Sequence, residues 1–268
     1  MPERGVVGHF GWASPHSKRL TFGLALLALA TLICLIGMLG HSGRVSAATD
    51  FDVVVHDWVV AHRGDWPKLI QSMLLVTRLG DPPFAVTSTI AAMLWIYSLH
   101  RRSIAGVRRS EVFLWLWAIL GAWYIGRVLK LYFKRERPPI VNRLVIEMSY
   151  SFPSGHSVFA GAFYTTLAIL LSRVVPLSRP WLRIFAISLC MLAAITIAMS
   201  RVWLGVHYPT DVLAGLLIGS STVLGVWLVR IGWAHSQPSG QGDQAVEGCW
   251  NESQSPGVER TAGLDENN

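Results

Sequence analysis

Charged side chains are scarce in this sequence. Asp, Glu, Lys and Arg make up 15% of its 268 residues, whereas soluble domains use roughly one quarter. Hydrophobic residues make up 52%, and the mean hydropathy is +0.42. They come in blocks of roughly 20, the length that crosses a bilayer, rather than in the alternating runs of a membrane barrel. The composition excludes an ordinary soluble protein and predicts an all-α, polytopic membrane protein.

Cysteine is scarce too, with three in the whole chain. Cys34 and Cys190 lie in apolar blocks, and Cys249 lies in a polar stretch near the C-terminus. Three such residues do not make a disulfide framework. No redox chemistry is indicated.

Six transmembrane helices are predicted from the apolar blocks. They cover residues 21–39, 82–99, 111–133, 157–171, 181–199 and 212–231. The alternative for the first block is a signal peptide, with Ser46, Ala47 and Ala48 resembling a cleavage site. The block is longer than a typical signal core, which favours an uncleaved helix. The expected organisation is a segment at 1–20, a membrane domain at 21–232 and a disordered tail at 233–268. The tail contains six acidic residues and one basic residue, Arg260.

The net charge of +7 raises the possibility of nucleic-acid binding. The basic residues lie mainly in short loops between apolar blocks, as the positive-inside bias produces, so no nucleic-acid partner is expected. Residues 100–110 contain four Arg and no acid, which places that loop in the cytoplasm. Both termini are then cytoplasmic, and residues 40–81, 134–156 and 201–211 lie outside.

Two of these outer segments have features of their own. Residues 134–156 contain four Lys or Arg and two acids, against the usual charge bias. A positive cluster on this side indicates an anionic ligand at the outer membrane face. In the first outer segment, residues 51–60 are expected to form a short amphipathic helix on the membrane surface.

A basic series ends the third apolar block. Arg127, Lys130, Lys134 and Arg137 follow spacings of three, four and three, which predicts a cationic ridge on one helical face before Pro138. The alternative is that long basic side chains merely extend from a helix end to the interface.

The sequence Pro153-Ser154-Gly155-His156 precedes the fourth block. Ser154 is suited to cap a helix, and Gly155 removes a side chain where a ligand would approach. Free backbone N–H groups at a helix start bind anions, and His156 would lie within reach. On its own, such a histidine is more often only interfacial.

His207 and Asp211 are four residues apart where the last block begins. The carboxylate can then accept a hydrogen bond from one imidazole nitrogen and leave the other free to attack. This makes His207 a candidate nucleophile. The alternative is that Asp211 only offsets the helix dipole.

Taken together, these segments resemble the three-part signature of the type 2 phosphatidic acid phosphatase (PAP2) family, whose helical-bundle fold is shared with vanadium haloperoxidases. Lys130 precedes Arg137-Pro138 by six intervening residues. Ser154, Gly155 and His156 follow Pro153, and Ser200-Arg201 precedes His207 and Asp211 at the family's spacing. The resemblance runs from about residue 129 to residue 218.

The resemblance implies a mechanism without metal or cofactor. In it, His207 attacks phosphorus, Asp211 orients its ring, and His156 protonates the leaving oxygen. The phosphate oxygens are then held by five groups, those of Lys130, Arg137, Ser154, Gly155 and Arg201.

The expected activity is that of a lipid phosphatase in the bacterial inner membrane, acting at its outer face. Undecaprenyl diphosphate is the first choice of substrate, and phosphatidylglycerophosphate, phosphatidic acid and lipid A phosphates remain open. A phosphotransferase is the nearest alternative, because a phosphohistidine can also pass its phosphoryl group to a lipid hydroxyl. A haloperoxidase is disfavoured by the six spans. A transporter is the alternative from another class, but its polar groups would gather at mid-membrane rather than at one edge.

Overall fold

The computed structural model describes residues 22–24, 50–103 and 109–234. All regular elements in these ranges are helices, so the predicted all-α class is confirmed. The α-helices are α2 (Asp50–His62), α3 (Pro67–Thr77), α4 (Pro82–Arg101), α5 (Arg109–Phe133), α6 (Gly155–Val174), α7 (Pro180–Trp203) and α8 (Pro209–Ala234). Short 3₁₀ turns cover Arg63–Asp65, Arg78–Gly80 and Ile140–Asn142.

Five of the described helices, α4 to α8, are long and apolar enough to span a membrane. They correspond to five of the six predicted spans, with ends that differ by at most a few residues. The remaining prediction, for residues 21–39, lies outside the described residues except at 22–24. Most of the predicted tail and part of the 100–110 loop lie outside them as well.

Prolines mark where several helices begin. Pro67, Pro82, Pro180 and Pro209 occupy the first positions of α3, α4, α7 and α8. Proline suits this position because its fixed φ angle is helical and its missing N–H would have no partner there. The sequence therefore sets the start of four helices locally.

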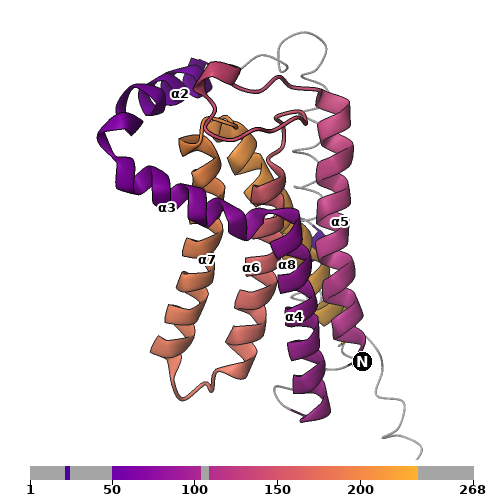
Figure 1. Ribbon diagram of the computed structural model, residues 1–268. Coiled ribbons are helices and arrows are strands. Elements are labelled where there is room, and N and C mark those ends of the chain that lie inside the picture. Colours follow the sequence, from indigo (N-terminus) through magenta and orange to yellow (C-terminus); the bar gives the residue numbers. More distant parts are fainter. Residues whose placement is uncertain (1–21, 25–49, 104–108, 235–268) are drawn as a thin grey trace, which may run out of the picture.

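Helix α6 lies at the centre of the bundle, with α7 on one side and α4, α5 and α8 on the other (Figure 1). Its closest packing is against α8 and α7. Helices α2 and α3 run across one end of the bundle (Figure 1). The helix expected at 51–60 is thus found, as α2, whereas α3 was not predicted.

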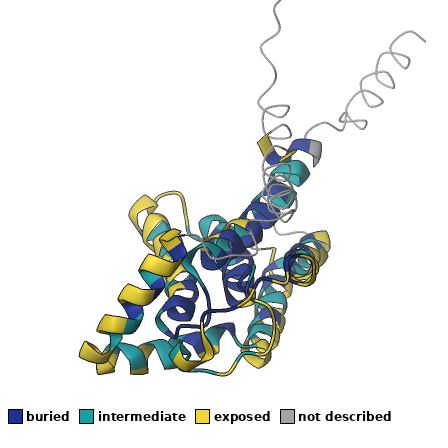
Figure 2. Ribbon diagram, turned by 90° about the horizontal axis from the view of Figure 1, so that it is seen from above, coloured by how far each residue is buried: buried dark blue, intermediate teal, exposed yellow. Residues whose placement is uncertain are grey.

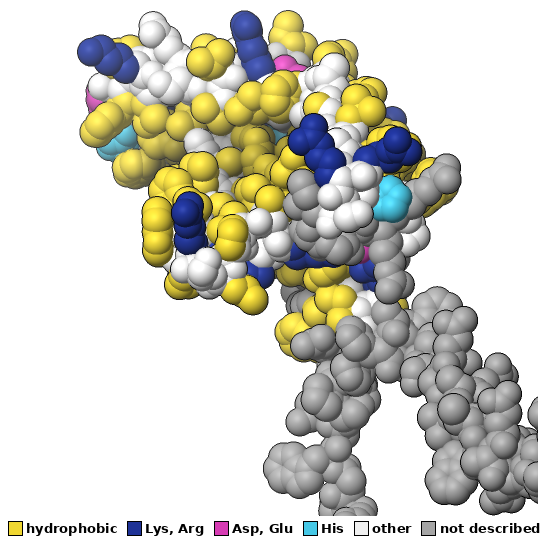
Figure 3. Space-filling model, turned by 90° about the horizontal axis from the view of Figure 1, so that it is seen from below, with side chains coloured by type: hydrophobic (Ala, Val, Ile, Leu, Met, Phe, Trp, Pro, Cys, Tyr) yellow, Lys and Arg dark blue, Asp and Glu magenta, His cyan; other side chains and the backbone are white. Residues whose placement is uncertain are grey.

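Burial follows this arrangement. Buried residues concentrate on the inward faces and along α6, while exposed residues line the outward faces (Figure 2). The main core includes Ile96 of α4, Trp115 of α5, Phe163 of α6 and Val223 of α8. Seen from the end opposite α2, hydrophobic side chains cover much of the described surface (Figure 3). An apolar exterior of this kind suits contact with lipid.

The close crossing of α6 and α8 depends on glycine. A Cβ atom added at Gly219 would lie 2.3 Å from the carbonyl oxygen of Val158, and one at Gly161 would lie 2.6 Å from that of Leu216. Small residues let two membrane helices approach this closely. The crossing in turn fixes the start of α6 relative to the start of α8.

Replacing Gly219 with alanine is therefore expected to destabilise the protein by about 1–3 kcal/mol, the usual cost of overpacking. Gly121→Ala on α5 is the matched control, because a Cβ there meets nothing within 4 Å. Thermal unfolding in detergent measures both. A melting temperature of Gly219→Ala equal to that of the control would contradict the packing argument.

Candidate active site

The three signature segments meet at the end of the bundle that α2 and α3 cross. In the third segment, α7 ends at Trp203, just after Arg201. Gly205 then adopts φ +70°, and a Cβ there would lie 2.4 Å from the carbonyl oxygen of Asn142. Only glycine fits both this conformation and this contact. The turn places His207 directly before α8.

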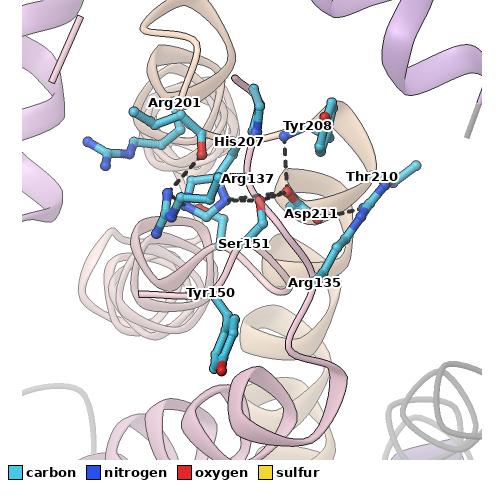
Figure 4. Close-up of polar contacts among 12 residues, drawn as sticks. Arg135, Arg137, Tyr150, Ser151, Arg201, His207, Tyr208, Thr210 and Asp211 are labelled. Carbon is cyan, nitrogen blue, oxygen red and sulfur yellow. Dashed lines mark hydrogen bonds and ion pairs between the residues drawn. The ribbon is translucent and has the colours of Figure 1, made fainter. Parts of the chain in front are cut away.

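His207 and Asp211 lie side by side in the interior, as the sequence predicted (Figure 4). The Nδ1 atom of His207 lies 3.4 Å from Oδ2 of Asp211. The same carboxylate oxygen accepts hydrogen bonds from Ser151 Oγ at 2.5 Å and from the backbone N–H of Tyr208 at 3.0 Å. On the other side of the ring, Nε2 lies 3.1 Å from Nη1 of Arg137. The imidazole is thus held at both nitrogens.

The second segment begins α6 as predicted. The Ser154 hydroxyl caps the helix by accepting a hydrogen bond from the Ser157 N–H at 3.4 Å. Gly155 is exposed, and a Cβ there would meet nothing within 4 Å. The Nε2 atom of His156 lies 3.0 Å from Oδ1 of Asp81. A Cβ at Gly80 would lie 2.4 Å from the His156 ring, so this glycine makes room for it.

The predicted four-residue cationic ridge is wrong. Helix α5 ends at Phe133, and Lys134 has φ +46°, which turns the chain away from the helix axis. Lys134 and Arg127 are exposed, whereas Lys130 and Arg137 are buried. Lys130 is buried from the helix and Arg137 from the segment after it, whereas Arg127 lies at the exposed edge of the same cavity.

The signature cations hold the segment before α6. The Lys130 ammonium donates to the carbonyl oxygen of Tyr150 at 2.8 Å, and Nε of Arg137 donates to that of Ser149 at 2.6 Å. The Glu147 carboxylate forms an ion pair with Arg201 and lies 3.6 Å from Nη2 of Arg137. The two guanidinium groups therefore already face one shared anion.

A cavity of about 560 Å³ runs from the site to the outer faces of helices α4 and α5. Its polar end is lined by three cations, two histidines, Gly155 and two carboxylates, namely Arg127, Lys130, Arg137, His156, His207, Gly155, Asp81 and Glu147. The lining continues along α4 and α5 over apolar side chains that include Ala85, Val86, Ile90, Leu116, Ile119 and Leu120. The cavity thus combines a cationic end with an apolar channel beside the region expected to face lipid.

Burial and neighbouring cations determine the charge of His207. Burial lowers the pKa of its imidazole well below the ordinary value, and the charges of Arg137, Lys130 and Arg201 lower it further. Burial also lowers the pKa of the Arg137 guanidinium to about 10. His207 is therefore neutral at pH 7, with an electron pair on Nε2 that accepts a hydrogen bond from Arg137, while Arg137 stays protonated.

Several residues of the site were not singled out from the sequence. Arg135 forms ion pairs with Asp211 and Asp52, both at 2.6 Å. Ser151 donates to Asp211, and Asp81 pairs with His156. Arg135 and Glu147 appear in the sequence only as members of the charged 134–156 segment. No local pattern distinguishes Asp52 or Asp81.

The expectation of a site without metal or cofactor stays a prediction. In the ranges that the structure describes, no three His, Cys, Asp or Glu side chains gather as a possible metal site. Asp211 and His207 are instead engaged with each other and with arginines.

Comparison with known proteins identifies the family. The profile of the PAP2 superfamily matches residues 111–234. The chain is 41% identical over 204 residues to phosphatidylglycerophosphatase B of Bacillus subtilis, which covers 75% of this chain and 89% of that protein. The chain belongs to the PAP2 superfamily. This PAP2 protein is therefore a phosphatase, that is, a phosphoric ester hydrolase, with membrane-spanning helices.

Two further similarities were found. The crystal structure of a transmembrane PAP2 type phosphatidylglycerolphosphate phosphatase from Bacillus subtilis superposes with a TM-score of 0.62 at 25% identity, covering 81% of this chain and 98% of that one. An undecaprenyl-diphosphatase of Sulfolobus acidocaldarius is 38% identical over 71 residues, which make up 26% of this chain and 29% of that protein.

Proposed function

We propose that this PAP2 protein hydrolyses a membrane lipid phosphate or diphosphate through a phosphohistidine on His207. The observation that carries the proposal is the cavity, where two histidines and three cations end a channel lined by apolar side chains. A phosphorylated head group fits the cationic end, and an acyl or prenyl chain fits the apolar part.

In the first step, the electron pair on Nε2 of His207 attacks phosphorus, and a P–N bond forms as the bond to the leaving oxygen breaks. His156, which takes up a proton when the anionic phosphate binds, gives that proton to the leaving oxygen and is left neutral. Asp211 accepts a hydrogen bond from Nδ1–H and offsets the positive charge that develops on the ring. In the second step, water loses a proton to His156 and attacks phosphorus, the P–N bond breaks, and its electron pair returns to Nε2.

The phosphate oxygens need positive partners throughout both steps. Lys130, Arg137 and Arg201 supply charge, and the Ser154 hydroxyl and Gly155 N–H add donors at the start of α6. In the structure, Glu147 pairs with Arg201 and lies near Arg137. An incoming phosphate therefore displaces this carboxylate and takes over its partners.

Undecaprenyl diphosphate is the first choice of substrate, and the likeness to an undecaprenyl-diphosphatase supports it. Phosphatidylglycerophosphate is the second candidate, because the relative at 41% identity is a phosphatidylglycerophosphatase. The Arg-rich loop at 100–110 favours a site on the outer face of a bacterial inner membrane, with both termini in the cytoplasm.

The test is phosphate release by the purified protein in detergent. The panel contains undecaprenyl diphosphate, phosphatidylglycerophosphate, phosphatidic acid and lipid A, each with and without EDTA. Release from one or more lipids that persists in EDTA supports the proposal. No release from any of them, or activity lost in EDTA and restored only by Mg²⁺, would refute it. Release only in the presence of a lipid acceptor would identify a phosphotransferase.

The channel between α4 and α5 can be tested separately. Val86 lines it and is exposed, so Val86→Trp is expected to fold but to obstruct the lipid chain. We expect kcat/KM for a long-chain lipid phosphate to fall roughly tenfold, about 1.4 kcal/mol, with p-nitrophenyl phosphate unaffected. Leu94→Trp is the control, on the same helix and exposed but outside the lining. Equal effects of both variants would place the lipid chain elsewhere.

The low pKa of His207 predicts a particular pH dependence. A histidine with the ordinary pKa of about 6.5 would become protonated, and so inactive as a nucleophile, as the pH falls through 6.5. Because the pKa of His207 is lower, we expect kcat/KM, corrected for substrate ionisation, to persist between pH 6.5 and 5.5. A loss centred on pH 6.5 in this profile would show that the histidine is not shifted.

A further inference from the structure

Arg135 joins two buried carboxylates behind the proposed nucleophile. Its Nη1 atom lies 2.6 Å from Oδ1 of Asp211, and its Nη2 atom lies 2.6 Å from Oδ2 of Asp52. Both carboxylates are fully buried, and Arg135 is 4% exposed. Figure 4 shows Arg135 beside Asp211, on the side away from Arg201. The two arms of the planar guanidinium thus bind two different carboxylates.

Asp52 reaches this position from α2, far away in the sequence. Its carboxylate also accepts the backbone N–H of Thr210 at 3.0 Å and the Thr210 hydroxyl at 2.7 Å. Burial alone would raise the pKa of Asp52, but the hydrogen bonds from Arg135 and Thr210 hold it below its ordinary value. Asp52 is therefore an anion that fixes both Arg135 and the first turn of α8, which carries Asp211.

We propose that Asp52 and Arg135 are positioning residues for the nucleophile, acting through Asp211 on His207. This inference rests on the proposed function. Arg135 holds Oδ1 of Asp211, so that Oδ2 stays turned toward Nδ1 of His207. Ser151 and the Tyr208 N–H hold that second oxygen from the other side. The carboxylate is thereby kept in the orientation that aims Nε2 at phosphorus.

The alternation of negative and positive charge from Asp52 through Arg135 to Asp211 explains why both Asp52 and Arg135 are needed. When Nε2 bonds to phosphorus, positive charge develops on the His207 ring, and Asp211 must offset it. An arginine alone beside Asp211 would weaken that effect, because its own charge opposes the charge on the ring. Asp52 balances Arg135, so the orientation is gained without loss of negative potential at His207.

The experiment compares Asp52→Asn with Asp57→Asn, an exposed control on the same helix. Rapid quench measures the rate of phosphohistidine formation, and competitive inhibition by inorganic phosphate, which binds without a bond to Nε2, measures the phosphate cradle. For Asp52→Asn we expect phosphohistidine formation to slow tenfold or more, with the Ki of inorganic phosphate changed less than twofold, because Lys130, Arg137 and Arg201 are untouched. The control should match the wild type in both.

A purely structural role would instead weaken the binding of inorganic phosphate and slow the reaction together. That result, or an unchanged rate in Asp52→Asn, would overturn the inference. Because removing one buried charge can impair folding, the double variant Asp52→Asn, Arg135→Gln removes both charges. It should also form phosphohistidine slowly with a normal Ki for inorganic phosphate, and a wild-type rate in it would overturn the inference.

The two proposals fail differently. Absence of phosphohistidine in the wild type would refute the proposed function itself. Normal phosphohistidine in both the wild type and Asp52→Asn would leave that function standing and refute only the role of Asp52 and Arg135.

Discussion

Replacing His207 with alanine is expected to abolish phosphoenzyme formation and lower kcat by roughly 10⁴-fold or more, as for other nucleophiles held by a carboxylate. The ring is 2% exposed and lies between Asp211 and Arg137, which hold it at both nitrogens. Phosphate release from a lipid phosphate and from p-nitrophenyl phosphate measures the loss. It should be the same for both, because both need the nucleophile.

His156→Ala is the comparison that separates nucleophile from acid. A lipid alkoxide is a poor leaving group and needs a proton, whereas p-nitrophenolate leaves without one. The His156 variant should therefore lose much more activity on the lipid than on the aryl phosphate. Equal loss on both substrates in both variants would contradict this division of roles.

Replacing Arg201 with lysine is expected to reduce kcat by roughly tenfold or more, at least about 1.4 kcal/mol. Arg201 is buried at the end of α7, where its guanidinium donates to the Thr77 hydroxyl at 2.6 Å and pairs with Glu147. Lysine keeps the charge but loses the planar fork that can bind the protein and two phosphate oxygens together. Steady-state kinetics and vanadate inhibition measure the effect.

Arg179→Lys is a suitable control for that variant, because Arg179 lies at the far end of α7, where the helix begins. It should keep wild-type kinetics. Full activity in Arg201→Lys would mean that Arg201 supplies only charge, and a normal vanadate Ki with a lower kcat would mean that it does not touch the phosphate.

Most of the fold could be predicted because long apolar blocks determine membrane helices almost on their own. The ends of α4 to α8 agree with the predicted spans to within a few residues. Helix α3 was not predicted because its eleven residues are too few to span a membrane. The ridge failed because spacing assumes a continuous helix, whereas Lys134 adopts a positive φ and ends it.

The candidate site could be predicted only where its residues stand close together in the sequence. His207 and Asp211 are one helical turn apart, and Ser154 caps its own helix. Asp52 and Thr210 are 158 positions apart, and Asp81 and His156 are 75 apart. These pairs come together because α2 and the turn before α4 pack against the bundle. A sequence periodicity does not reveal such distant contacts.

Mapping the covalent phosphate is the most direct test of the central claim. The protein is mixed with a ³²P-labelled lipid phosphate, quenched within milliseconds in alkali, which preserves phosphohistidine, and digested for mass spectrometry. The account predicts phosphate on the peptide that contains His207, and none on it in His207→Ala. Phosphate on His156 or on a carboxylate, or turnover with no phosphopeptide at any quench time, would contradict it.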